Sequence, residues 1–172
     1  MYIYVTAPVG TDGAVHLYQM HRAAMQEHFP RFFIRQIEAL QADRQQLTLA
    51  KNKDCIYICT MTEGGIFRAL WEGCEKLDCG CEVFLEKIPI RQEVIEICEL
   101  TGDNPYELDS SGSLLLFSET DEQDRAFHLI GKTTGSRDRV VVFQGGRRFL
   151  TPPKRQQTDI NSRKSGIQPY GQ

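Results

Sequence analysis

The sequence lacks an apolar run close to the ~20 residues that span a bilayer, and its N-terminus lacks a basic segment followed by an apolar core. We therefore expect no membrane segment and no secretory signal, with the cytoplasm as the default compartment. A net charge of −3 predicts no general attraction to nucleic acid or to anionic lipid. The chain also shows no internal repeat and no linker that would divide it.

What is present suits one folded domain with a polar end. A chain of 172 residues is long enough to bury roughly 70% of its extended surface. We predict that residues 1–153 form this domain. After Pro152-Pro153 the hydrophobic pattern stops, and residues 154–172 are polar, basic and predicted to be disordered.

Strand-like and helix-like segments alternate along the chain. The predicted strands are Tyr2–Val5, Asp54–Met61, Cys81–Ile88, Ser113–Phe117, Phe127–Thr133, Arg139–Phe143 and Arg147–Leu150. The predicted helices are Ala14–Phe29, a second one after Pro30, Ile66–Leu77 and Ile90–Thr101. The segment Asp54–Met61 is apolar on both faces, which predicts a central strand, and the last three strands read as an antiparallel meander. This order predicts an α+β fold with a mixed β-sheet covered by helices.

The run Thr62-Glu63-Gly64-Gly65 lies between a predicted strand and a predicted helix. Two glycines there allow a sharp turn and the close approach of another group. A helix that starts at this point directs backbone N–H groups and its positive dipole end outward, which suits a phosphate or a carboxylate. The alternative is a strand-to-helix turn in which Thr62 or Glu63 caps the helix.

Two further loops supply hydroxyls and backbone N–H groups. The first, Gly10-Thr11-Asp12-Gly13, precedes a helix, and the second, Ser110-Ser111-Gly112-Ser113, precedes a buried strand. Turns use the same residues, so the loops predict an anion site only if the fold brings all three together. The candidate phosphate- or nucleotide-binding residues are Thr62, Glu63, Gly64, Gly65, Gly10, Thr11, Gly13, Ser111 and Gly112.

No catalytic residue and no metal ligand is assigned. The spacing Cys74-x4-Cys79-x-Cys81 lacks the second cysteine pair of a structural zinc site, so the six cysteines are interpreted as free thiols, mostly buried. The run Gly131-Lys132-Thr133 is not a P-loop, because Ala126 stands where that motif needs glycine.

Taken in order, four segments resemble the C-terminal domain of the aminoimidazole ribonucleotide (AIR) synthase superfamily. They are PVGTDGAV (8–15), TEGGIFRALWE (62–72), EKIPIRQEVIEICELTGDNPYELDSSGSLLL (86–116) and IGKTTGSRDRVVVFQGGRRFL (130–150). The superfamily includes AIR synthase, the hydrogenase maturation carbamoyl dehydratase, selenophosphate synthetase and thiamine-monophosphate kinase. The subgroup that the chain resembles most is the AIR synthase-related proteins allied to the hydrogenase maturation factor.

The resemblance implies an α/β sandwich that normally follows a second, N-terminal domain. That domain supplies most of the ATP and magnesium site and the main dimer interface. The run Thr62–Gly65 would then be the phosphate-facing loop of the C-terminal domain. ATP and magnesium are thus implied by the resemblance alone, and we expect no cofactor for this chain by itself.

The chain also departs from the family pattern. The acidic nucleotide-binding domain is missing, and Cys59-Thr60 replaces the His-Asp pair that commonly precedes the Gly-Gly stretch. The helix between the buried strand and the meander is compressed into Glu119–Arg125. The tail has no cysteine like the one that carries the chemistry of the hydrogenase maturation factor. The carbamoyl dehydratase reaction therefore cannot be assigned from the sequence.

Three functions remain. The favoured one is a non-catalytic binding or regulatory module that either self-associates or docks on a separately encoded N-terminal nucleotide-binding half. The second is the C-terminal half of a split or truncated ATP-dependent enzyme. The third is a small phosphate- or nucleotide-binding protein, for which a bulky residue at Gly65 should weaken anion binding without unfolding the domain.

Overall fold

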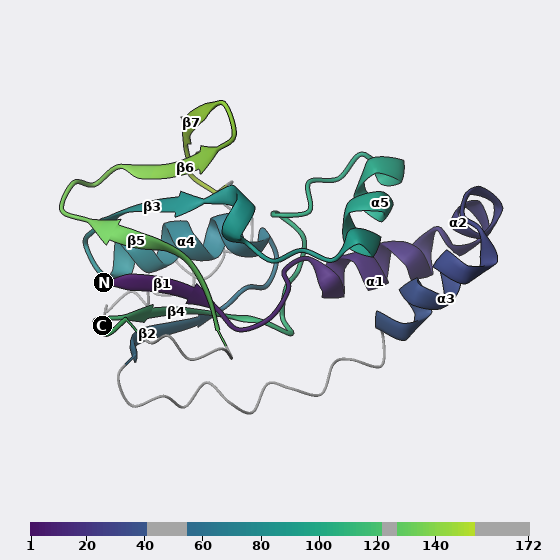
Figure 1. Cartoon of the computed structure of the whole chain (residues 1–172), viewed down its shortest axis with the longest axis horizontal. Coiled ribbons are helices and arrows are strands. Elements are labelled where there is room, and N and C mark those ends of the chain that lie inside the picture. Colours follow the sequence, from purple (N-terminus) through teal and green to yellow (C-terminus); the bar gives the residue numbers. More distant parts are fainter. Residues whose placement is uncertain (41–54, 122–126, 154–172) are drawn as a thin grey trace, which may run out of the picture.

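The computed structural model describes residues 1–40, 55–121 and 127–153. In these ranges the strands are β1 (Tyr2–Val5), β2 (Cys55–Thr60), β3 (Gly80–Phe84), β4 (Leu114–Ser118), β5 (His128–Thr134), β6 (Arg139–Phe143) and β7 (Gly146–Phe149). The helices are α1 (Thr11–Met20), α2 (Arg22–His28), α3 (Arg31–Leu40), α4 (Gly65–Lys76) and α5 (Gln92–Thr101), with a short 3-10 turn η1 (Leu85–Lys87) after β3. Figure 1 shows the sheet at one end of the molecule and α1, α2, α3 and α5 at the other.

The strands form one mixed sheet in the order β2-β4-β1-β5-β3-β6-β7. Every pairing is antiparallel except β3 with β6, which is parallel. The prediction of an α+β fold with a mixed sheet is thereby confirmed. The predicted meander of the last three strands is wrong, because β3 lies between β5 and β6. Since β1 and β3 already occupy both sides of β5, the chain crosses β3 and joins the sheet at its far side.

The prediction that Asp54–Met61 forms a central strand is also wrong. Among the described strands, β2 pairs only with β4 and lies at the edge of the sheet. Its residues alternate between half-buried and exposed, and Ile56 and Ile58 are 47% and 39% exposed. Apolar residues on both faces of a segment normally indicate burial on both faces. Here one of the two apolar faces is partly open to solvent.

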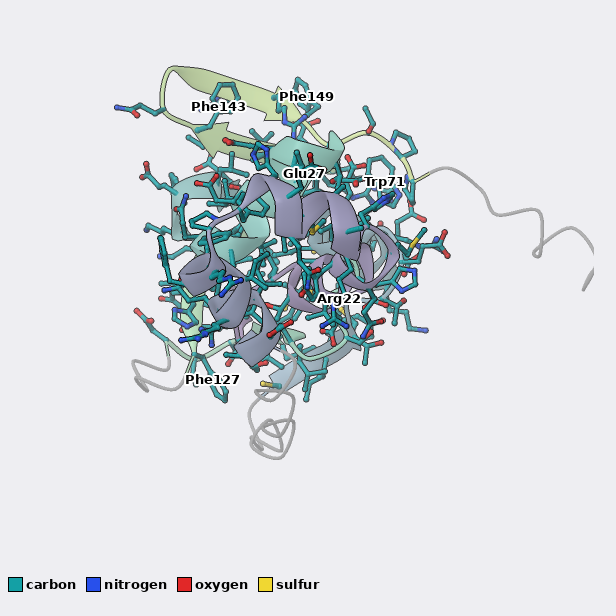
Figure 2. All side chains as sticks on the ribbon, turned by 90° about the vertical axis from the view of Figure 1, so that its right-hand side faces the viewer. Arg22, Glu27, Trp71, Phe127, Phe143 and Phe149 are labelled. Atoms are coloured by element: carbon teal, nitrogen blue, oxygen red, sulfur yellow. The ribbon has the colours of Figure 1, made fainter. Side chains whose placement is uncertain are left out.

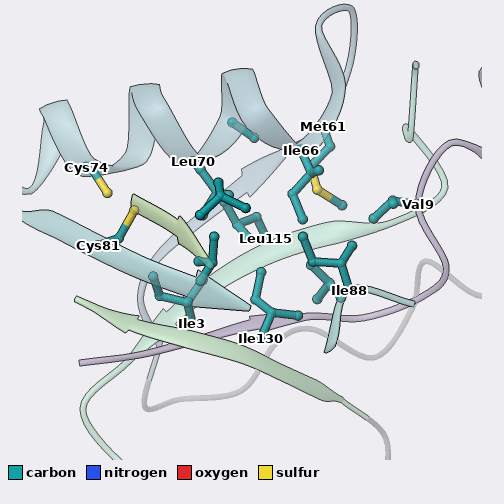
Figure 3. Packing of buried hydrophobic residues seen from close by; sticks show 14 of the residues in the cluster. Ile3, Val9, Met61, Ile66, Leu70, Cys74, Cys81, Ile88, Leu115 and Ile130 are labelled. Atoms are coloured by element: carbon teal, nitrogen blue, oxygen red, sulfur yellow. The ribbon is translucent and has the colours of Figure 1, made fainter. Parts of the chain in front are cut away.

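Helix α4 covers one face of the sheet and forms the main core with it (Figure 3). Ile66 and Leu70 of α4 are fully buried against sheet residues such as Ile3. A Cβ atom at Gly73 would lie 2.6 Å from the Phe117 ring, so this glycine lets the helix sit close to β4. The amphipathic pattern of Ile66–Leu77 therefore predicted both the helix and the face that it buries.

The helices α1, α2, α3 and α5 share a second core that lies beside the sheet (Figure 1). The predicted single helix Ala14–Phe29 is interrupted at His21, which leaves the helical conformation. The apolar spacing runs across this break because Tyr18 on α1 and Met25 on α2 both face the second core. Figure 2, which looks onto these helices, shows Arg22 and Glu27 at their surface.

Turn predictions had mixed outcomes. The sequence predicts positive φ angles at Gly135 and at the Gly145-Gly146 pair. Gly145 has a φ of 101° and lies in the β6–β7 turn, whereas Gly135 and Gly146 do not adopt a positive φ. The predicted tail lies outside the described residues, as does most of Glu119–Arg125, and residues 119–121 are not helical.

None of the helices in the described ranges combines the length and the hydrophobicity needed to cross a bilayer.

Replacing Phe117 with Ala should lower the free energy of unfolding by about 3–5 kcal/mol, because it removes a fully buried ring between α4 and β4. Phe32→Ala is the control, since Phe32 on α3 is 65% exposed, and its effect should stay within about 0.5 kcal/mol. Urea unfolding followed by circular dichroism measures both. Equal losses in the two variants would contradict the position of the core.

Candidate functional site

The Gly-Gly turn starts α4 by means of backbone groups. Gly64 and Gly65 have φ angles of 85° and 58°, both in the left-handed region. The N–H of Gly65 donates to the carbonyl of Thr62 (2.9 Å), and the N–H of Ile66 donates to the carbonyl of Tyr106 (3.0 Å). The N-cap residue is Gly64, which has no side chain, so the alternative in which Thr62 or Glu63 caps the helix is wrong. The backbone carbonyls of Thr62 and Tyr106 accept the first N–H groups of the helix instead.

Close packing explains why the second residue of the pair is glycine. A Cβ atom at Gly65 would lie 2.4 Å from the carbonyl oxygen of Tyr106 and 2.6 Å from that of Leu108. No side chain fits at those distances, and the positive φ is itself unfavourable for other residues. A bulky residue at Gly65 would therefore disturb the fold as well as any bound anion. The substitution proposed from the sequence is not a selective test of binding.

The segment 106–113 also holds the loop Gly10–Gly13. The N–H of Gly10 donates to Oγ of Ser110 (2.7 Å), and the N–H of Gly13 donates to the carbonyl of Asp109 (2.9 Å). On the other side, the N–H of Ser110 donates to the carbonyl of Met61 (2.7 Å), just before the Gly-Gly turn. The fold thus brings the three predicted loops onto one connecting segment.

The side-chain carboxylates of Asp12 and Asp109 accept hydrogen bonds from N–H groups of the loop 110–113. The N–H of Gly112 donates to Oδ2 of Asp12 (2.7 Å), and the N–H of Ser111 donates to Oδ1 of Asp109 (2.8 Å). The hydroxyl of Ser111 also donates to Asp109. Negative charge at these positions opposes a phosphate there. Among the nine predicted residues, Glu63 and Gly64 line a separate pocket that also contains arginines.

A pocket of about 510 Å³ opens beside Gly64. It is lined by Glu63, Gly64, Phe67, Arg68, Glu107, Arg148, Phe149, Leu150, Thr151, Pro152 and Pro153. The ring of Phe67 stacks on Tyr106, with ring centres 5.2 Å apart, and the guanidinium of Arg148 lies 5.2 Å from the centre of the Phe67 ring. Figure 2 shows Phe149 at this end of the sheet. The volume falls in the range of small-molecule sites.

Two arginines line the pocket, together with the carboxylates of Glu63 and Glu107. Arg68 is on the first turn of α4, where its Nε donates to Oε1 of Glu72 (2.7 Å), and Arg148 is on β7. Planar guanidinium groups bind phosphate and carboxylate oxygens in pairs. Sequence reasoning missed both arginines. Arg68 was detectable because it follows the Gly-Gly turn by one helical turn, but only the fold places Arg148 in the same pocket.

The residues that replace the His-Asp pair of the family offer little chemistry. Burial raises the pKa of Cys59 to about 12, and the nearby carboxylate of Glu72 contributes to this rise. The thiol is therefore protonated at neutral pH and is a poor nucleophile. Thr60 is exposed at the end of β2.

Two other sequence interpretations are decided by the fold. Gly131-Lys132-Thr133 lies within strand β5, and the Lys132 ammonium lies 4.6 Å from the centre of the Tyr2 ring. Rejection of the P-loop is thus confirmed, since that motif needs a loop that enters a helix. In the part of the chain that the structure describes, no three or more His, Cys, Asp or Glu side chains are arranged to hold a metal ion.

The fold and its loops are those of a known class of domain. The family described as AIR synthase related protein, C-terminal domain, matches residues 2–138, and the chain belongs to this family. A hydrogenase expression/formation protein of Methanocaldococcus jannaschii is 32% identical over 69 residues, which are 40% of this chain and 21% of that protein. Carbamoyl dehydratase HypE of Rhodobacter capsulatus is 35% identical over 57 residues, 33% of this chain and 17% of that protein.

Solved structures share the fold. The hydrogenase maturation protein HypE of E. coli superposes with a TM-score of 0.68 at 18% identity, over 91% of this chain and 51% of that one. Thiamine monophosphate kinase of Aquifex aeolicus gives a TM-score of 0.55 at 20% identity, over 88% of this chain and 51% of that one. The chain therefore spans about half the length of these proteins and a smaller part of the curated relatives.

Replacing Gly65 with Ala should lower the free energy of unfolding by about 2 kcal/mol or more, because the new Cβ meets two carbonyl oxygens at a positive φ. Gly102→Ala is the matched control. Its φ is also positive (78°), but nothing lies within 4 Å of the added Cβ, so it should cost only about 1 kcal/mol. Thermal unfolding of both variants would show the difference, and similar values would argue against the close approach of the segment 106–108.

Proposed function

We propose that this domain is a non-catalytic binding module that holds a phosphate-bearing small molecule in the pocket beside Gly64. The observation that carries the proposal is that two arginines, Arg68 and Arg148, both line a pocket of about 510 Å³ at the start of α4. The positive dipole end of α4 adds to their charge. An apolar wall that includes Phe67 and Phe149 suits the base of a nucleotide.

Catalysis by this chain alone has little support. Phosphoryl transfer needs cations that neutralise the phosphates and a group that positions the attacking oxygen. The two carboxylates at the pocket, Glu63 and Glu107, stand beside the arginines and are not arranged with other ligands for a metal ion in the described residues. Cys59, where the family carries a histidine, stays protonated at neutral pH because burial raises its pKa. We therefore assign binding, and no reaction, to the isolated domain.

Isothermal titration calorimetry with ATP, with and without Mg²⁺, tests this proposal. The isolated chain should bind with a Kd on the order of 0.1–1 mM, without hydrolysis, because the carboxylates of Glu63 and Glu107 offset part of the charge of the two arginines. Arg148→Ala should weaken binding about tenfold by removing one charge-assisted contact. Arg137→Ala is the control, since its side chain is 80% exposed and pairs with Asp78 away from the pocket, so binding should not change.

Two outcomes of this titration would contradict the proposal. Equal affinities of the parent protein and of Arg148→Ala would show that the pocket does not hold the phosphate. Micromolar binding accompanied by ATP turnover would show that the domain is an enzyme by itself. A variant that loses its cooperative unfolding would be replaced by Arg68→Gln, which removes the other charge.

The second candidate is half of a two-part ATP-dependent enzyme. It is favoured by the length of the solved relatives, of which this chain spans about half, and by the crystal structure of one of them, HypE, in complex with ATP. HypE has also been solved as a complex with HypF, so a protein that shares this fold associates with another protein. In this version the missing half binds most of the nucleotide, and the pocket beside Gly64 closes over its phosphates.

Mixing the chain with a separately expressed N-terminal half tests this version. Size-exclusion chromatography with light scattering should show a complex, and ATP hydrolysis should exceed that of either part. If the chain forms a homo-oligomer by itself and the mixture stays inactive, the enzyme version fails and the binding module remains. The apolar Ile56 and Ile58 on the edge strand β2 are the natural candidates for such self-association.

A further inference from the structure

Three of the six cysteines gather at the end of α4, away from the pocket. Cys74 is fully buried on the last turn of α4, Cys81 is buried on β3, and Cys79 is half-buried just before that strand. Figure 3 shows the sulfur atoms of Cys74 and Cys81 directed toward one another between α4 and β3. Neither the proposed binding function nor the main core requires three adjacent thiols.

The way in which α4 ends brings Cys74 and Cys79 together. The N–H of Cys79 donates to the carbonyl of Cys74 (3.0 Å), and the N–H of Asp78 donates to the carbonyl of Glu75 (3.3 Å). Asp78 has a φ of 49°. These features define a Schellman motif, which normally places the two side chains at the positions of Cys74 and Cys79 in contact. The backbone thus fixes two thiols at close range, five residues apart in the sequence.

The three thiols shift one another's pKa values. Hydrogen bonding with Cys74 lowers the pKa of Cys81, and the same interaction raises the pKa of Cys74. Burial raises the pKa of Cys79 to about 11. Because Cys79 is half-buried while Cys74 and Cys81 are buried, Cys79 is the thiol of the three that a small oxidant reaches most easily.

Arg139 places a positive charge beside Cys81. It lies next to Cys81 in the register of β3 and β6, and its charge lowers the pKa values of all three thiols. Its guanidinium lies 4.0 Å from the centre of the Trp71 ring and 3.4 Å from Oε1 of Glu75. Its Nε is buried and has no hydrogen-bond partner among the described residues. A guanidinium held in this way favours negative charge on nearby sulfur.

We propose that Cys74, Cys79 and Cys81 form a reversible thiol–disulfide site, in which a small peroxide oxidises Cys79 and Cys74 resolves it. Burial raises the pKa of Cys79 to about 11, so only a small fraction of this thiol is deprotonated at neutral pH; that thiolate attacks hydrogen peroxide to give a sulfenic acid and hydroxide. The Cys74 thiol then attacks that sulfur, a disulfide forms, and water leaves. Two equivalents of an external thiol reverse the reaction and are themselves oxidised to a disulfide.

Mass spectrometry of the full chain tests this site directly. The protein is treated with hydrogen peroxide, its remaining thiols are blocked with iodoacetamide, and it is digested with trypsin. Cleavage after Lys76 separates Cys74 from Cys79 and Cys81, so a disulfide to Cys74 joins two peptides. The joined pair should form in the parent protein and disappear after a reductant is added.

Matched variants identify the sulfurs. Cys79→Ser should abolish the joined pair, whereas Cys81→Ser should retain it, and Cys98→Ser in the helical core should leave its rate unchanged. Arg139→Gln should slow its formation by about tenfold, while Arg139→Lys, which keeps the charge, should stay close to the parent rate. Circular dichroism would show that each variant is folded.

Three results would overturn the proposal. They are a joined pair that persists in Cys79→Ser, full alkylation of Cys74 after peroxide treatment of the parent protein, and preferential oxidation of Cys55 with Cys59. If the joined pair formed at equal rates in Arg139→Gln and Arg139→Lys, the positive charge at this position would have no role in the reaction.

Discussion

The close approach of one backbone segment to the start of α4 governs the arrangement of the candidate site. The carbonyls of Tyr106 and Leu108 lie where a side chain at Gly65 would be, and the N–H of Ile66 donates to one of them. The same segment continues to Ser110, which holds the loop before α1. Two lobes with separate cores are thereby linked through a few backbone hydrogen bonds, whose geometry depends on glycine. Close packing against the carbonyls of Tyr106 and Leu108 is therefore enough to require glycine at position 65, whether or not a ligand binds nearby.

This arrangement gives the two sides of the connecting segment different polar groups. On one side, the carboxylates of Asp12 and Asp109 accept the N–H groups of the loop 110–113. On the other side, Arg68 and Arg148 line the pocket beside Gly64 together with Glu63 and Glu107. The nine residues that the sequence put forward together thus fall into two environments, and guanidinium groups line the pocket in one of them.

Local sequence patterns predicted the helices and strands that form because of residues close together in the sequence. The amphipathic spacing of α4 and α5 and the β-branched run of β1 were enough to place them. The predicted helix Ile90–Thr101 and α5 end at the same residue, and Gly102 follows with a φ of 78°. Patterns could not show that β3 separates β5 from β6 or that β2 lies at an edge, because strand order depends on contacts between distant segments. For the same reason Arg148, far along the chain from Arg68, was invisible as part of the site. The type of turn after α4 was also unmarked, because Asp78 takes the left-handed position where glycine is usual.

The central claim is that the pocket beside Gly64 receives a phosphate-bearing molecule while the loops at Asp12 and Ser111 do not. A titration of the ¹⁵N-labelled protein with ATP, followed by amide chemical shifts, tests it most directly. The account predicts that the largest shifts fall on Gly64, Phe67 and Arg148, with the spectrum otherwise preserved. Shifts concentrated on Gly13, Ser111 and Gly112, with those at Gly64 unmoved, would contradict it.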